Sequence, residues 1–272
     1  MTAVLEKRRA VVSRLPGIGA FVRNDTVATV IAFALLLAVW QLASLALGPD
    51  SKVLAGPWTV VATGFAMAGT GELIGHLSGS VWTLLTAAAS AVAIGVPLGF
   101  AIGLSRIFAS GAELTLRFMR NISALALLPL FVVWFGLGAT PVYAMTLYLM
   151  LTIVIYNSLG AVREVPRKYV AAVRTLGGGW VHQVLGVYLP ASLPGIVSGI
   201  RLCVIYGWQG VVAAEVVLSA SGIGGMMAEG RVAGRVDVIL LGMLLIGVVN
   251  MVFEWLIFGP VERSVARRWR SA

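Results

Sequence analysis

The chain has 272 residues, of which 59% are hydrophobic and 11% are charged, and its formal net charge is +9. Soluble domains carry about 25% charged and about 45–50% apolar residues, so this apolar excess excludes a single globular core and predicts helices in a lipid bilayer. The positive charge does not indicate nucleic-acid binding, because the basic residues lie in short segments between apolar runs and form no stripe interleaved with aromatic residues.

Six apolar stretches approach or reach the roughly 20 residues that a helix needs to cross a bilayer core of about 30 Å. They predict an all-α membrane protein with six transmembrane helices. The third stretch is short and the fourth follows almost at once, which predicts a tight helical hairpin around Gly136–Pro141. The six stretches lie near Val27–Leu47, Val81–Leu104, Ser123–Gly138, Pro141–Val162, Ile196–Leu218 and Val238–Gly259.

Lysine and arginine gather in alternate connections, and short cytoplasmic loops are enriched in these residues. The N-terminal arm, the second and fourth connections and the C-terminal tail are strongly basic, whereas the first connection holds only Lys52 and the third none. We therefore expect both termini in the cytoplasm. We expect Gly48–Gly79 outside, with a surface helix around Trp58–Met67. Ser44-Leu45-Ala46 resembles a signal cleavage site, but we favour an uncleaved anchor because cleavage would leave five spans.

This topology predicts four parts. They are a cytoplasmic arm (1–26), the first span with a periplasmic loop (27–80), a membrane core (81–260) with a cytoplasmic loop (163–194), and a cytoplasmic tail (261–272).

The chain carries no recognisable catalytic, metal or nucleotide motif. His76 and His182 fall on opposite sides of the predicted membrane and cannot share a metal. Cys203 is the only cysteine, lies in an apolar run and fits a packing role. The sequence has no G-x-x-x-x-G-K-[ST] phosphate loop, so nucleotide-driven work must come from a partner. We expect no catalytic residue, no metal site and no cofactor in this chain.

Ionisable residues inside a membrane are costly and indicate function by default. Arg201 and Glu254 lie near enough to the interface to snorkel or to pair with each other. Glu215 either lines a pathway or satisfies helix ends near the outer loop. Trp208 lies seven residues before Glu215, on nearly the same helical stripe, whereas Gln209 differs by roughly 120°. We expect Trp208 and Glu215 to line the dimer interface or the translocation path, with Gln209 turned toward neighbouring helices.

The connection Arg163–Pro194 predicts a helical hairpin between two spans. Pro166 suits the first turn of a helix and Gly177 its C-terminal cap. A second short helix follows over Trp180–Tyr188 and ends at Pro190. The alternative is an amphipathic loop lying on lipid. The apolar face of the first helix consists of positions i, i+3, i+4 and i+7, which are Tyr169, Ala172, Val173 and Leu176.

This loop resembles the signature loop of binding-protein-dependent ABC importer permeases, whose pattern is E-A-A, three residues, G, nine residues, I-x-L-P. Here Ala172, Gly177, Leu189 and Pro190 match at the right spacing, and Ala171 stands where the family has glutamate. In the family this loop is the coupling helix that seats in a groove on the ATPase. The resemblance implies that the coupling residues are Ala171, Ala172, Arg174, Thr175, Leu176, Gly177, Leu189 and Pro190.

The resemblance extends over roughly Val81–Arg270. Within the family, this part of the chain is similar to the subgroup that imports nitrate, taurine and alkanesulfonates. It includes Pro97-Leu98-Gly99, Trp134-Phe135-Gly136-Leu137-Gly138 and Ser221-Gly222-Ile223-Gly224. One departure is Ile122-Ser123-Ala124, where the subgroup usually has Ile-Pro-Pro.

The resemblance implies a type I importer permease in the bacterial inner membrane, with a second copy as a homodimer. Two ABC ATPases binding ATP and Mg²⁺ and a periplasmic solute-binding protein would complete the assembly. The resemblance also implies transport of a small solute by alternating access. It favours an anion as the solute, such as a sulfonate, nitrate or an aromatic carboxylate. The first rival is an ion-coupled secondary transporter, which would need broken helices or buried carboxylates in two related halves. An intramembrane enzyme is disfavoured by the missing catalytic motifs.

Overall fold

The computed structural model describes residues 25–48 and 53–260, and every regular element in those ranges is a helix. The chain divides into two units, Met1–Ala62 and Thr63–Ala272. The first unit contains α2 (Asp25–Leu47) and the start of α3 (Pro57–Gly69). Helix α3 confirms that a helix forms around Trp58–Met67. Most of the predicted arm, and the predicted tail, lie outside the described residues.

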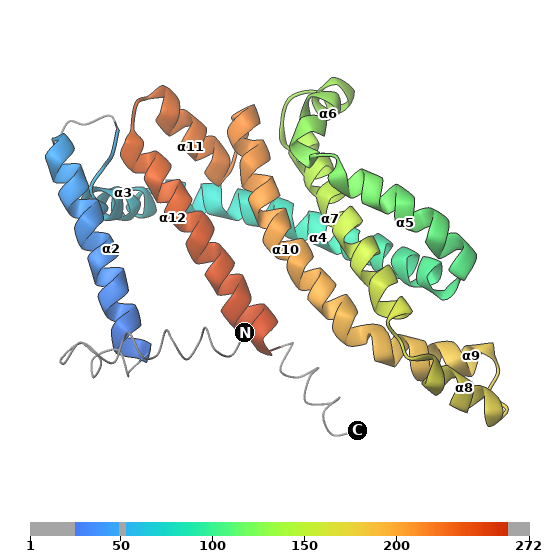
Figure 1. The fold of residues 1–272 in the computed structure, drawn as a ribbon. Coiled ribbons are helices and arrows are strands. Elements are labelled where there is room, and N and C mark those ends of the chain that lie inside the picture. Colours follow the sequence, from blue (N-terminus) through green and yellow to red (C-terminus); the bar gives the residue numbers. More distant parts are fainter. Residues whose placement is uncertain (1–24, 49–52, 261–272) are drawn as a thin grey trace. The chain divides into compact units, whose positions relative to one another are not determined.

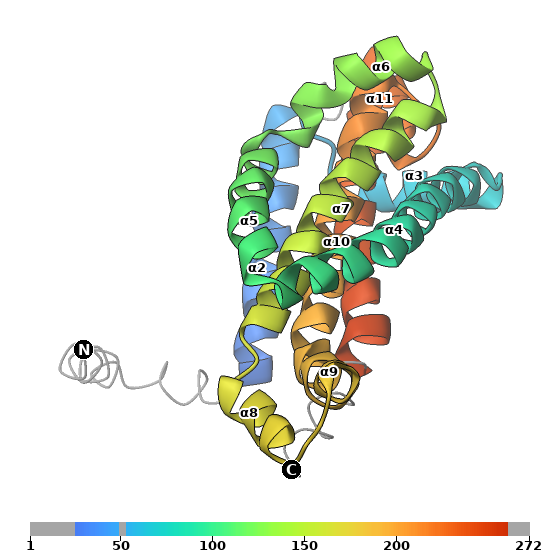
Figure 2. The same cartoon turned by 90° about the vertical axis from the view of Figure 1, so that its right-hand side faces the viewer.

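In the second unit, the long helix α7 packs between α4 and α10, and α10 also packs against α11 (Figures 1 and 2). The short helices α8 and α9 lie together at one end of α7 and α10, and α6 lies at the other end. The elements are α4 (Glu72–Leu104), α5 (Arg106–Asn121), η1 (Ala124–Leu127), α6 (Leu128–Phe135), α7 (Ala139–Arg163), α8 (Arg167–Thr175), α9 (Trp180–Gln183), η2 (Val184–Tyr188), α10 (Leu189–Leu218), α11 (Ile223–Val232), α12 (Val236–Val252) and η3 (Phe253–Phe258).

Five helical segments of the described chain are long and apolar enough to cross a membrane. They belong to α2, α4, α7, the run containing α10, and α12. A sixth span exists only as a bent pair, Ile107–Asn121 with Ala124–Phe135, which meet at 78°. Within the expected third span, Ser123–Gly138, the helix covers only Ala124–Phe135, which is too short to cross a bilayer alone, and the expected second connection is helix α5. The reason is that α5 is apolar on one face only, so its mean polarity is that of a loop.

The end of the second loop helix and the presence of a short helix after α10 also differ from expectation. The second loop helix does not end at Pro190, because a continuous helical run leads from Trp180 through the π-turn η2 into α10. Pro190 falls in the first turn of α10. Proline is tolerated in the first turn of a helix, because the backbone N–H that it lacks has no acceptor within the helix there. The short helix α11 was not expected at all. The predicted hairpin before α7 is confirmed, since Gly136 (φ 78°) and Gly138 (φ 137°) form a turn between α6 and α7.

Glycines let α7 lie close to both neighbours. On α4, Gly95, Gly99 and Gly103 recur every four residues and face α7. A Cβ on Gly99 would lie 2.5 Å from the backbone oxygen of Ile155 and 2.8 Å from Cβ of Ser158. Glycines of α10 face α7 in the same way, and they are Gly195, Gly199, Gly207 and Gly210. Because lipid and leucine are equally apolar, such close backbone approach is what drives helices together in a bilayer.

Candidate functional site

The first helix of the loop between α7 and α10 ends in a tightly bonded cap. Gly177 has φ +82°, a left-handed conformation that favours glycine. Its N–H donates to the carbonyl of Arg174 (3.1 Å), and the N–H of Gly178 donates to that of Val173 (2.8 Å). These two bonds form a Schellman motif. The cap predicted at Gly177 is confirmed.

The two arms of the hairpin are held together by a small apolar cluster and one buried amide. Val165, Val170 and Val187 are buried together, with Val173 partly buried against them. The buried side chain of Gln183 donates from Nε2 to the carbonyl of Gly178 (3.2 Å). Sequence analysis missed Gln183, because a single polar residue in a short helix carries no periodic signal. The loop between α7 and α10 is therefore an ordered hairpin whose two arms pack on each other.

The predicted apolar face of α8 divides into a buried part and an exposed part. Val173 packs inward, on the same side as Val170. The other positions of the predicted face, Tyr169, Ala172 and Leu176, are exposed. Leu176 is 87% exposed. Helix α9 and η2 carry further exposed apolar side chains. We call the exposed apolar side chains of the hairpin the loop patch, and they are Tyr169, Ala172, Leu176, Trp180, Val181 and Leu185.

Of the residues expected to couple to an ATPase, Ala172 and Leu176 belong to the loop patch, and the others are also exposed or half-buried. Ala171, Arg174, Thr175 and Gly177 are exposed on or just after α8, and Leu189 is exposed at the start of α10 with Pro190 half-buried beside it. Ala171 stands at the surface, so the position where the family has glutamate is accessible to a partner. Exposed apolar patches rimmed by polar residues mark interaction surfaces.

The two pathway candidates lie inside the chain. Trp208 is fully buried, donates from Nε1 to the carbonyl of Ile246 (3.1 Å) and meets the ring of Phe253 edge-on. Glu215 is 1% exposed. Gln209 is exposed, so the expectation that it turns toward neighbouring helices is wrong. Angular spacing shows which residues share a stripe, but it does not show which stripe faces the protein. A path-lining role for Trp208 and Glu215 stays a prediction.

Glu215 is held in a buried polar cluster that joins α4, α10 and α11. The Ser80 hydroxyl lies 2.9 and 2.8 Å from its two carboxylate oxygens and accepts the N–H of Ile223 (2.8 Å). The N–H of Gly224 donates to the carboxylate (3.0 Å). Gly222 has φ +123°, and a Cβ there would overlap the carboxylate. Sequence analysis missed Ser80, because 135 residues separate it from Glu215. The cluster fixes the start of α11.

Comparison with known proteins identifies the family. Residues 91–263 match the family described as the binding-protein-dependent transport system inner membrane component. The chain belongs to this permease family. It is similar to the taurine transport system permease protein TauC of Escherichia coli (strain K12), at 32% identity over 228 residues that cover 81% of the chain and 82% of TauC. It is also similar to the nitrate import permease protein NrtB of Leptolyngbya laminosa, at 26% identity over 276 residues that cover 97% of the chain and 98% of NrtB.

The fold of the permease is similar to a solved structure of the MetNI methionine ABC transporter in inward-facing conformations. The TM-score is 0.62 at 19% identity, and the match covers 71% of the permease and 95% of that chain. This likeness confirms the expected type I importer fold. The expected subgroup is confirmed by TauC and NrtB. The permease is a transport component and not an enzyme.

Of the two alternatives considered for Arg201 and Glu254, snorkelling or pairing, the permease shows the pair. Arg201 of α10 donates from Nε to Glu254 of η3 (3.2 Å), and its Nη2 also contacts this carboxylate. The pair joins two membrane helices. Because a charge is costly in a bilayer, pairing is the expected solution.

Proposed function

We propose that this permease works as a homodimer in an ATP-driven importer, with both termini cytoplasmic. It receives a small anion from a periplasmic binding protein and releases it into the cytoplasm by alternating access. Two ABC ATPase subunits hold ATP and Mg²⁺ and dock on the loop patch. The observation that carries this proposal is the exposed apolar loop patch on a helical hairpin whose two arms pack together.

The geometry of the hairpin suits a coupling role. A helix that lays an apolar face into a groove is a recurring mode of recognition, with anchors at i, i+3 and i+7. In the loop patch these anchors are Tyr169, Ala172 and Leu176. The hairpin begins directly after α7 and continues without a break into α10. Movement of a docked ATPase would therefore be passed to both helices rather than absorbed by a flexible loop.

The names of the relatives support a substrate class. TauC and NrtB are named for taurine and nitrate, and both solutes carry a small oxyanion group. We extend this chemistry to the present permease and propose a small organic or inorganic oxyanion as its substrate. The choice among a sulfonate, nitrate or an aromatic carboxylate lies with the binding protein.

The test is copurification with the ABC ATPase encoded beside this chain, followed by uptake in vesicles. Leu176→Asp places a charge in the loop patch and should abolish copurification and uptake. Leu137→Asp is the matched control, because Leu137 is 81% exposed in the turn before α7, at the end remote from the loop. It should leave copurification intact. Equal loss in both variants would refute docking through the loop patch. Uptake without any ATPase would instead support an ion-coupled transporter.

A further inference from the structure

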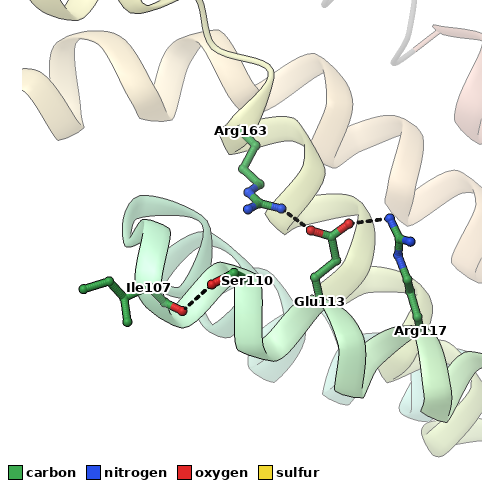
Figure 3. A network of polar contacts seen from close by, with 5 residues as sticks. All are labelled: Ile107, Ser110, Glu113, Arg117 and Arg163. Carbon is green, nitrogen blue, oxygen red and sulfur yellow. Dashed lines mark hydrogen bonds and ion pairs between the residues drawn. The ribbon is translucent and has the colours of Figure 1, made fainter.

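A cluster of three charged side chains joins α5 to the end of α7. The Glu113 carboxylate lies between two arginines, as Figure 3 shows. One of its oxygens contacts Nη2 of Arg117 at 2.5 Å, and the other contacts Nη1 of Arg163. Arg117 belongs to the same helix as Glu113, whereas Arg163 is the last residue of α7. Of these two contacts, the one with Arg163 therefore links two helices.

This link lies at the end of a longer contact between α5 and α7, next to the coupling loop. Farther from the loop, Leu116 of α5 is buried with Leu159 of α7. Farther still, the carbonyl of Met119 in α5 accepts a hydrogen bond from the Tyr148 hydroxyl of α7 (2.8 Å). The two helices are thus antiparallel. Because an apolar contact has no fixed direction, the charged link is what ties Arg163, at the loop end of α7, to one position of α5.

Beside the link, a cavity of about 330 Å³ separates Glu113 from the start of α10. Glu113 lines the cavity from α5, Arg163 lines it from α7, and Gly195 and Ser198 line it from α10. Glu113 therefore faces α10 across a space and does not pack on it. Close to the loop, a movement can reach this part of α5 through the contact with Arg163.

The exposure of the link argues against a purely stabilising role. The side chains of Glu113 and Arg163 are 27% and 36% exposed, and ion pairs with access to solvent contribute little to stability. The apolar cluster around Leu116 holds α5 to α7 without them. Glu113 also lies in the bent helix pair that makes the sixth candidate span. Charged residues are costly in such a segment and indicate function by default.

We infer that Glu113 is a positioning residue that makes α5 follow the coupling loop. Helix α8 begins at Arg167, directly after the short connection that follows Arg163. The chain itself carries a movement of the loop into α7 and α10, since both are joined to it. Helix α5 has no such connection and follows through the link between Glu113 and Arg163. This inference rests on the proposed function, because an ATPase must move the loop.

The test compares a reporter on α5 with a reporter on α10. The permease–ATPase complex is reconstituted in nanodiscs with the binding protein, and a bimane fluorophore is attached to Ile107→Cys or to Val217→Cys. Ile107 is 85% exposed on α5 and Val217 is 58% exposed on α10, whereas the native Cys203 is fully buried and should not be labelled. In the otherwise unchanged chain, a non-hydrolysable ATP analogue should change the fluorescence of both reporters.

Substitutions in the cluster should separate the two reporters. Arg163→Gln and Glu113→Gln should each abolish the response on α5 and leave the response on α10, because they break the link between α5 and α7. Arg117→Gln is the matched control, since it removes the other arginine from the same carboxylate but leaves the link, and both reporters should respond. Glu113→Arg should abolish the α5 response, and adding Arg163→Glu should restore it by reversing the ion pair.

The outcomes that contradict the inference are distinct from those that contradict the proposed function. An α5 response that survives Arg163→Gln, that is lost equally in Arg117→Gln, or that the charge reversal fails to restore would overturn the inference. Loss of both responses in Arg163→Gln would mean that the cluster only supports the fold and would overturn it as well. If only the α10 reporter responds in the unchanged chain, the inference fails and the proposed function stands. If the α10 reporter is silent there, the coupling role of the loop fails, and the inference fails with it.

Discussion

Replacing Gly99 with alanine puts a methyl group into the closest contact between α4 and α7. The new Cβ would lie 2.5 Å from the backbone oxygen of Ile155 and 3.1 Å from its Cα, whereas ordinary contact begins at 3.4 Å. The helices would have to separate by about 1 Å, because a backbone oxygen cannot rotate away as a flexible side chain can. Overpacking of this kind costs about 1–3 kcal/mol.

The matched control is in the same helix. Gly75 of α4 has nothing within 4 Å of its would-be Cβ. Alanine there gains helix propensity without a clash and should stabilise the protein by about 0.5–1 kcal/mol. The two substitutions are chemically identical and are expected to change stability in opposite directions.

The assay is thermal unfolding of the purified permease in detergent. A chain of this size shifts its Tm by about 2–4 °C per kcal/mol. We therefore expect Gly99→Ala to lower the Tm by about 2–12 °C and Gly75→Ala to leave it unchanged or raise it slightly. An unchanged Tm in Gly99→Ala, or equal losses in both variants, would refute the close packing of α4 on α7.

Three further predictions concern the loop, the buried polar cluster and the topology. Gly177→Val should weaken ATPase copurification but not membrane insertion, because a left-handed residue with a side chain costs about 1–2 kcal/mol; Gly179→Val, where φ is −71° and the space is open, should behave as wild type. Ser80→Ala removes a donor from a buried carboxylate and should cost about 1–3 kcal/mol of stability, whereas exposed Ser78→Ala should cost little. A reporter fused after Ala272 should be active only if it works in the cytoplasm, and activity of a periplasmic reporter there would contradict the expected topology.

Local and one-dimensional features were predictable from the sequence. Apolar stretches long enough to cross a bilayer identified five of the spanning segments, because the cost of exposing polar groups to lipid acts on each segment separately. The Gly177 cap was predictable because its bonds join residues within one turn. The family was recognisable from the spacing of Ala172, Gly177, Leu189 and Pro190, since that spacing belongs to one continuous hairpin.

Helix α5 shows where prediction from hydropathy stops. Its apolar residues cover one face and its charged residues another, so its average composition is that of a connection. Only the packing of Leu116 against Ile155 and Leu159 reveals it as part of the core. A window average discards the angular information that decides which side of a helix is buried.

The sequence alone determined which residues of α10 share a stripe, and only the tertiary structure decided which stripe faces inward. Trp208 and Glu215 do lie on the buried side, but their partners come from α12, α4 and α11. The ion pair of Glu113 with Arg163 depends on packing in the same way, since the two residues are 50 positions apart. Helical periodicity is set within a few residues of each position, whereas burial and ion pairing depend on neighbours that the chain brings together only when its helices pack.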